Sequence, residues 1–100
     1  MKYEELEQKV IEWAEDKGIF GKSTPVKQIG KTQEELTETL IALVKNDEPE
    51  IEDGIGDMLV TIIILAKMVG LDSNKCLDSA YNVIKGRTGK MVNGLFVKDK

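Results

Sequence analysis

The chain has 100 residues, 41% of them hydrophobic and 32% charged, which is the size and composition of one ordinary globular domain. No room remains for a second catalytic domain. The formal net charge of -4 argues against a general duplex-DNA binder, so no nucleic-acid partner is expected. Because so small a chain buries a modest fraction of its surface, we expect it to associate with itself as a homodimer or homotetramer.

The residue types that are absent or rare in the chain exclude some kinds of metal site and cross-link. The chain has no histidine and a single cysteine, Cys76, so it can build neither a zinc site nor an intrachain disulfide. A lone thiol fits a reducing cytoplasm, the expected location. The N-terminal residues lack the apolar core of a secretory signal. The apolar run 58–71 is roughly fourteen residues long where a membrane span needs about twenty, so it is predicted to be a buried helix.

The first half of the chain predicts two helices. Apolar residues recur at helical spacing over 3–17, which indicates the first helix. Ser23 or Thr24 is a suitable N-cap and Pro25 suits the first turn, which predicts a second helix over 25–45.

The second half predicts two more helices and a different kind of tail. A third helix is expected over 49–69, and Asp72 or Ser73 can cap a fourth over 74–86 whose apolar stripe faces the others. The tail, 88–100, holds an Asn-Gly pair between short apolar runs, which predicts a hairpin or an extended segment. Residues 1–100 are therefore expected to form one all-α, four-helix bundle-like domain with a short C-terminal hairpin.

The second predicted helix carries its charges on one face. Helical projection places five polar side chains within one third of its circumference, away from its apolar stripe. These are Gln28, Lys31, Glu34, Glu35 and Glu38. Two interpretations are open: a solvated face on which Lys31 pairs with Glu34 and Glu35, or one half of a metal site.

The third predicted helix favours the metal site. Asp53 and Asp57 are four residues apart and share a face, and Asp57 enters the apolar run expected to be buried. An ionised buried carboxylate needs a partner or a cation. Mg²⁺, or Mn²⁺, accepts several carboxylate oxygens together with water and phosphate. The alternative is that Lys31 or a basic residue near the end of the fourth helix neutralises Asp57 directly.

Two glycines, Gly54 and Gly56, lie in the same predicted helical turn, where each is less favourable than alanine by roughly 0.8–1 kcal/mol. Either a neighbouring helix approaches closely there, or the missing side chains leave space for metal, water and phosphate. Both explanations are open.

Three blocks of sequence carry a resemblance to a known family. They are Gln28-x-x-Lys31-x-x-Glu34-Glu35-x-x-Glu38, Asp53-Gly54-Ile55-Gly56-Asp57-Met58-Leu59, and Tyr81-Asn82-Val83-Ile84-Lys85-Gly86-Arg87 followed by Gly89-Lys90-Met91. With these blocks in this order, most of the chain resembles the all-α nucleoside triphosphate pyrophosphohydrolases. The similarity is to the compact MazG-like members often encoded by phages and bacteria.

The resemblance implies a magnesium site. In that family a Glu-x-x-Glu pair and a Glu-x-x-Asp pair on the next helix bind the metal, which by position implies Glu35, Glu38 and Asp57. The position three residues before Asp57 is Gly54 instead of glutamate. One ligand is therefore missing or displaced, and Asp53, only about 40° from Asp57 around the helix, is the expected replacement.

The resemblance also implies a substrate and a reaction, the hydrolysis of a nucleoside triphosphate to monophosphate and pyrophosphate. Glu35 or Glu38 would orient or deprotonate the attacking water, with Glu34 in reserve. The residues implied to contact the substrate are Gln28, Lys31, Asn82, Lys85 and Arg87. Lys85 and Arg87 have a simpler alternative, which is to complement the C-terminal end of their helix.

Three other functions stay open. One is a dUTP- or dCTP-specific pyrophosphatase of the same superfamily. Another is a catalytically silent helical module that oligomerises or binds a partner, and the third is a regulator that binds a nucleotide without cleaving it.

Overall fold

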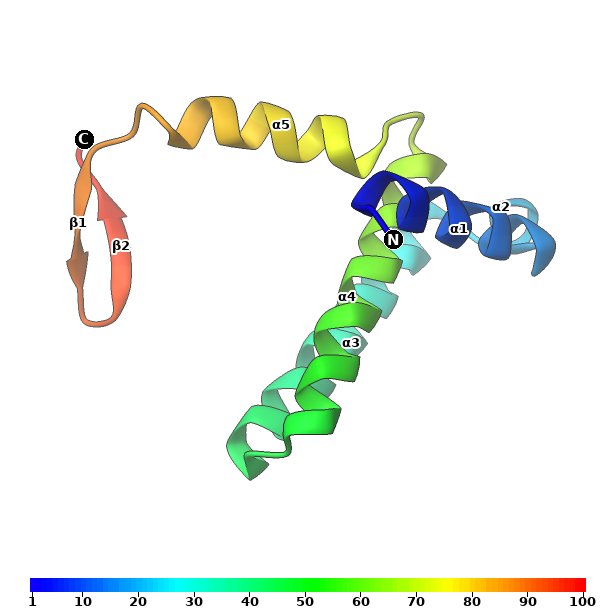
Figure 1. Cartoon of the computed structure of the whole chain (residues 1–100), viewed down its shortest axis with the longest axis horizontal. Coiled ribbons are helices and arrows are strands. Elements are labelled where there is room, and N and C mark those ends of the chain that lie inside the picture. Colours follow the sequence, from blue (N-terminus) through cyan, green and yellow to red (C-terminus); the bar gives the residue numbers. More distant parts are fainter.

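The computed structural model describes residues 1–100, and most of them are helical (Figure 1). The helices are α1 (Tyr3–Asp16), α2 (Ile19–Lys22), α3 (Pro25–Lys45), α4 (Glu48–Met68) and α5 (Ser73–Ile84). The strands β1 (Gly89–Val92) and β2 (Leu95–Lys98) pair antiparallel, with Gly89 opposite Lys98 and Val92 opposite Leu95. The predicted helical fold and hairpin are confirmed, and the single turn of α2 is an addition.

Local signals set the ends of these elements as predicted. The Thr24 side chain accepts a hydrogen bond from the backbone N–H three residues later, 3.2 Å away, and Asp72 does the same over 2.7 Å. Asn93 and Gly94 have φ of 50° and 83°, the left-handed pair that a tight hairpin turn requires. Short-range hydrogen bonding thus accounts for where the chain turns.

Helices α3 and α4 form an antiparallel pair that packs along a line of small and polar side chains. On α3 the buried residues are spaced by seven, four and three positions and so share one face, and on α4 the line runs through Gly54 and Thr61. The buried residues of α3 are Gln28, Glu35, Thr39 and Ala42. Large apolar residues of α3 lie outside this line, and Leu40 is 59% exposed. The pair therefore buries an edge of the polar face of α3 and leaves its apolar stripe uncovered.

The apolar run in α4 is buried on part of its circumference only. Ile63, Ile64 and Ala66 are buried, whereas Leu59 and Ile62 are about half exposed. The prediction of a wholly buried helix was therefore wrong for one flank of α4, because α1 and α3 cover only the remaining sides. No single helix is long and apolar enough to span a membrane, although α4 and α5 taken together, with a bend of 99° between them, pass on length and composition.

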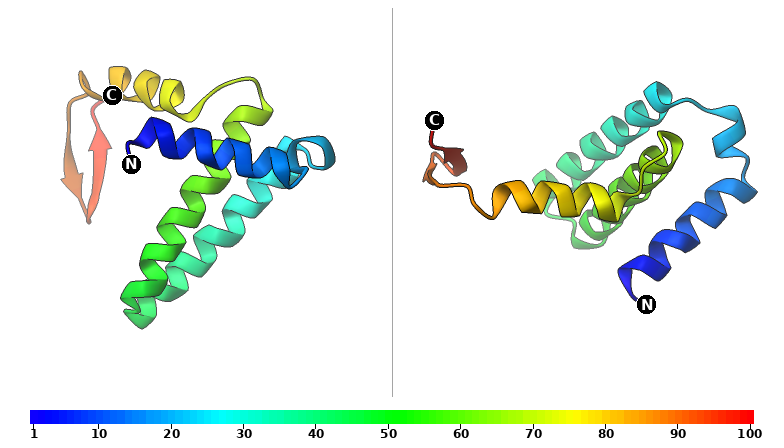
Figure 2. Two further views of the ribbon diagram at one scale, coloured as in Figure 1. Left: turned by 45° about the vertical axis from the view of Figure 1, so that its right-hand side comes forward. Right: turned by 90° about the horizontal axis from the view of Figure 1, so that it is seen from above.

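Helix α5 and the hairpin project away from the other helices (Figures 1 and 2). The predicted inward stripe of α5 is wrong for the single chain, since Leu77 and Tyr81 are more than half exposed. The radius of gyration is 15.8 Å, against about 13 Å for a compact domain of this length. One chain by itself thus places three long helices in contact and extends the fourth into solvent.

Candidate functional site

The candidate site begins with Glu35, which lies on the packed line between α3 and α4. Its side chain is 10% exposed, and one carboxylate oxygen, Oε1, is 3.6 Å from the Lys31 ammonium. The other, Oε2, is buried without a hydrogen-bond partner, and no other buried side-chain polar atom of the chain is left in that state. A buried carboxylate oxygen without a partner is costly, so its retention calls for an explanation.

Neighbouring negative charges make the ionised form of Glu35 still less favourable. Burial raises the pKa of its carboxyl above the ordinary value, and the negative charges of Glu38 and Asp57 raise the pKa further. Lys31 opposes them only in part, because its ammonium is also 3.1 Å from Glu34. The hydrogen bond and charge of Glu34, followed by the charge of Glu35, raise the pKa of Lys31. The predicted pairing of Lys31 with Glu34 and Glu35 is confirmed. Because Lys31 is shared between these two glutamates, it offsets only part of the negative charge around Glu35.

The remaining predicted metal ligands are all exposed. Asp57 is exposed, so the prediction that it lies buried in the apolar run was wrong, and the buried acid is Glu35. Asp57 lines an open groove of about 340 Å³ between α4 and α1, together with Trp13 and Val60. Asp53 and Glu38 are exposed as well. No three acidic side chains converge closely enough to hold a metal ion as they stand.

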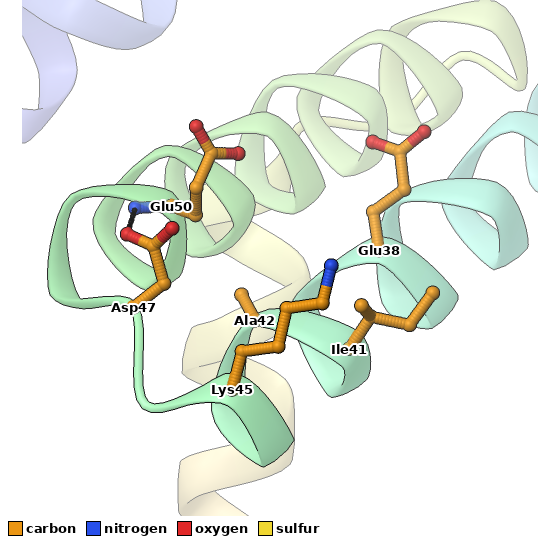
Figure 3. A pocket seen from close by; sticks show the side chains of 6 residues that line it. All are labelled: Glu38, Ile41, Ala42, Lys45, Asp47 and Glu50. Atoms are coloured by element: carbon orange, nitrogen blue, oxygen red, sulfur yellow. Dashed lines mark hydrogen bonds between the residues drawn. The ribbon is translucent and has the colours of Figure 1, made fainter.

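Sequence reasoning missed one carboxylate near this site. Glu38 and Glu50 project from α3 and α4 on the same side and line a hollow of about 380 Å³ together with Lys45 (Figure 3). Glu50 precedes Asp57 by seven residues, two helical turns, and therefore shares its face of α4. That spacing was the signal available in the sequence, and Glu50 joins the residues that could supply an oxygen.

The two glycines differ in their surroundings. A Cβ added to Gly54 would collide with the Thr39 hydroxyl and lie 3.3 Å from the Thr39 Cα, whereas no atom lies within 4 Å of one added to Gly56. Close helix approach therefore accounts for Gly54. Gln28 belongs to the same packed line, where its amide nitrogen donates a hydrogen bond of 3.1 Å to the Thr61 carbonyl. Its amide nitrogen is thereby engaged between the helices.

The residues implied to contact phosphates from the fourth helix are not near the carboxylates within one chain. The amide nitrogen of Asn82 donates to Asp78 over 3.4 Å on the same helix, and Lys85 and Arg87 are exposed at its C-terminal end. Helix α5 meets the end of α4 and then leads away (Figure 1). One chain thus brings together the side chains of α3 and α4 and keeps Lys85 and Arg87 apart from them. The side chains brought together are Lys31, Glu34, Glu35, Glu38 and Asp57.

Comparisons with known proteins show that the chain is similar in sequence to a phage protein. It is 40% identical over 70 residues to a protein of Haemophilus phage HP1 (strain HP1c1) described as an uncharacterized 18.2 kDa protein in the rep-hol intergenic region. The match covers 70% of this chain and 43% of the relative, so the chain spans less than half the relative's length. No family model and no solved structure matches the chain. The chain is therefore related to a phage-encoded protein whose description names no activity.

Proposed function

We propose that the chain is a magnesium-dependent nucleoside triphosphate pyrophosphohydrolase acting in the cytoplasm. The observation that carries the proposal is the buried, unpartnered Oε2 of Glu35 beside the negative charges of Glu38 and Asp57. A divalent cation would satisfy that oxygen and offset the repulsion. The nucleotide and the reaction rest on the resemblance of the three sequence blocks to the MazG-like pyrophosphohydrolases.

The residues present fit a hard divalent cation. All candidate ligands are carboxylate oxygens, the type that Mg²⁺ and Mn²⁺ prefer, and Mg²⁺ keeps several waters and substrate oxygens among its ligands. Glu35 is buried, whereas Glu38 and Asp57 are exposed and their negative charges act on it. Asp53 or Glu50, both on the Asp57 side of α4, would replace the oxygen missing at Gly54.

Different side chains would act as the base and as the phosphate-binding groups in this hydrolysis. Water adds to phosphorus while the α–β phosphoanhydride bond breaks, so the base takes a proton from water and pyrophosphate departs with the bridging oxygen. Glu38 is placed to accept that proton because it is exposed beside the hollow, and Glu34, paired with Lys31, is the reserve. Mg²⁺, when bound, would withdraw charge from the phosphate oxygens and acidify the water. Lys85 and Arg87 would neutralise the departing pyrophosphate.

A pyrophosphate assay tests the proposal. The purified chain is incubated with a panel of canonical and modified nucleoside triphosphates, dUTP and dCTP included, in Mg²⁺, in Mn²⁺ and in excess chelator. We expect pyrophosphate release in either metal and none in chelator. Glu38→Gln should lower the rate at least about 100-fold, the scale of losing one transition-state or ligand contact. Glu52→Gln, an exposed glutamate on another face of α4, is the matched control and should retain the rate.

A second function is favoured by a separate observation. The chain exposes many large apolar side chains, and its carboxylates do not converge. Both features suit a catalytically silent module that binds a partner. No release from any nucleotide, together with a melting temperature that Mg²⁺ leaves unchanged, would favour this module over the enzyme. Release from dUTP or dCTP alone would instead identify the specialist enzyme.

A further inference from the structure

Two threonines of α3 contact α4 on the packed line. The Thr32 hydroxyl donates a hydrogen bond of 2.8 Å to the Thr61 hydroxyl. Thr39 lies against Gly54, and its Cα is 3.3 Å from the position that a Cβ of residue 54 would occupy. Thr39 is buried, as is Glu35 one turn before it. We call the Thr32–Thr61 and Thr39–Gly54 pairs the threonine contacts.

The threonine contacts lie on either side of Glu35. On both helices they are seven residues apart, which is two turns, so they share one face of each helix. Because the helices are antiparallel, Glu35 is opposite the middle of the intervening part of α4, where Asp57 and Met58 lie. The Thr39 hydroxyl donates to the Glu35 carbonyl over 2.7 Å, and the Thr61 hydroxyl donates to the Met58 carbonyl over 2.7 Å. The same hydroxyls are therefore bonded to the residues that face each other at the middle.

Hydrophobic burial by itself would favour a different orientation of α3. Three leucines lie about 100° around this helix from the packed line, and each is more than half exposed. They are Leu36, Leu40 and Leu43. A rotation that turned them toward α4 would bury apolar surface and would also release the Glu35 carboxylate into water. The observed orientation, with a carboxylate inside and leucines outside, therefore has another cause.

The threonine contacts oppose this rotation. Turning α3 would break the Thr32–Thr61 hydrogen bond and would take the Gln28 amide away from the Thr61 carbonyl. It would also bring Leu40 to the place where α3 approaches Gly54 too closely for a larger side chain. Hydrogen bonds and close approach together therefore select the orientation that keeps Glu35 inside.

We propose that Thr32 and Thr39 are positioning residues, which hold the Glu35 carboxylate buried between α3 and α4 before a cation binds. Its unpartnered oxygen, Oε2, is then already in place, and the cost of ordering this ligand is met when the chain folds. The positioning describes the metal-free chain and stands on its own. Its consequence for Mg²⁺ affinity rests on the proposed function.

The positioning is tested by labelling carboxylates in the metal-free chain. Glycinamide and a water-soluble carbodiimide convert accessible carboxylates to amides, and mass spectrometry of peptides measures the extent at each residue. In wild type we expect Glu35 to be protected while Glu34 and Glu38 are labelled. Thr32→Val/Thr39→Val keeps the branched shapes and removes both hydroxyls, and it should label Glu35 several-fold faster with unchanged helix content. Equal protection of Glu35 in the two proteins would overturn the positioning.

Conservative and control variants separate the hydroxyls from general packing. Thr32→Ser/Thr39→Ser keeps both hydroxyls and should restore protection. Thr37→Val is the matched control: the Thr37 hydroxyl also donates to the carbonyl four residues earlier, over 3.2 Å, but Thr37 is exposed and off the packed line. It should leave Glu35 protected. Thr32→Val and Thr39→Val alone keep the test decisive if the double variant does not fold, since faster labelling of Glu35 in neither would contradict the positioning.

Calorimetric titration with Mg²⁺ alone distinguishes the positioning from the proposed function. The double valine variant should bind Mg²⁺ about 10- to 100-fold more weakly than wild type, the range seen when residues that orient a metal ligand are lost. In Glu35→Gln the two valines should cause no further loss, because the ligand that they position is gone, and an equal further loss would overturn the positioning. If wild type binds no Mg²⁺, the proposed function fails, while the labelling of Glu35 still decides the positioning.

Discussion

The packed line and the exposed apolar stripes of α3 and α4 lie on the same two helices and have opposite chemistry. The packed line is built from small and polar side chains: the Thr32 hydroxyl donates to Thr61 over 2.8 Å, and Thr39 fits against Gly54. The apolar stripes consist of leucines and isoleucines that a folding core would normally use, and they are exposed. They are Leu36, Leu40 and Leu43 on α3 and Ile55, Leu59 and Ile62 on α4. The difference indicates that the packed line positions a carboxylate between closely spaced helices, whereas the apolar stripes remain uncovered in the single chain.

The largest effect on the packed line is expected at Gly54, where α3 and α4 approach each other closely. Gly54→Ala should lower the free energy of unfolding by about 1–3 kcal/mol, because the new Cβ meets Thr39 and forces the helices apart. Urea unfolding followed by circular dichroism at a fixed chain concentration measures the change. Gly56→Ala is the control: with no atom near its Cβ, it should stabilise by roughly 0.5–1 kcal/mol through helix propensity. Equal effects at the two glycines would contradict the close approach.

A smaller effect is expected where the line uses a side-chain amide. Gln28→Met keeps the length of the side chain and removes the donor to the Thr61 carbonyl, which should lower the free energy of unfolding by about 0.5–1.5 kcal/mol. The Michaelis constant for the nucleotide should stay the same, since the amide nitrogen is engaged between helices. A raised Michaelis constant with unchanged stability would assign Gln28 to the substrate instead.

The smallest of the three effects is expected at Glu35 and depends on pH. Its pKa is raised in the folded chain, so in chelator the wild type loses stability as pH rises from the ordinary glutamate value of 4.5 through the raised one. Glu35→Gln removes that loss and should melt higher than wild type at neutral pH. The difference should vanish below pH 4.5.

Added Mg²⁺ should reverse the order of the melting temperatures of wild type and Glu35→Gln. Addition of Mg²⁺ should raise the melting temperature of wild type and leave that of Glu35→Gln nearly unchanged, because the variant lacks the charge that the cation satisfies. Differential scanning fluorimetry across pH, with and without Mg²⁺, measures both. A wild type that melts higher than the variant in chelator at pH 7 would show that Glu35 is already satisfied within the chain.

Part of the candidate site was predictable and part was not. The shared polar face of α3 and the pairing of Lys31 with Glu34 and Glu35 follow from spacing along one helix, and the structure confirms them. Asp57 was predicted to be buried and is exposed, and the burial of Glu35 was not predicted, because burial depends on which neighbouring helix covers each face. Glu50 was missed for a related reason, since its significance lies in facing Glu38 across two helices.

The sequence by itself determined the helix and turn positions. N-caps at Thr24 and Asp72 and the left-handed pair Asn93-Gly94 act through hydrogen bonds and backbone angles spanning a few residues, so they need no tertiary context. Only the tertiary structure decided which face of α3 lies inside and that α5 stands apart. Small residues such as Gly54 permit a close approach that hydrophobic periodicity does not reveal. Periodicity marks a surface for burial without saying whether the same chain or a second copy covers it.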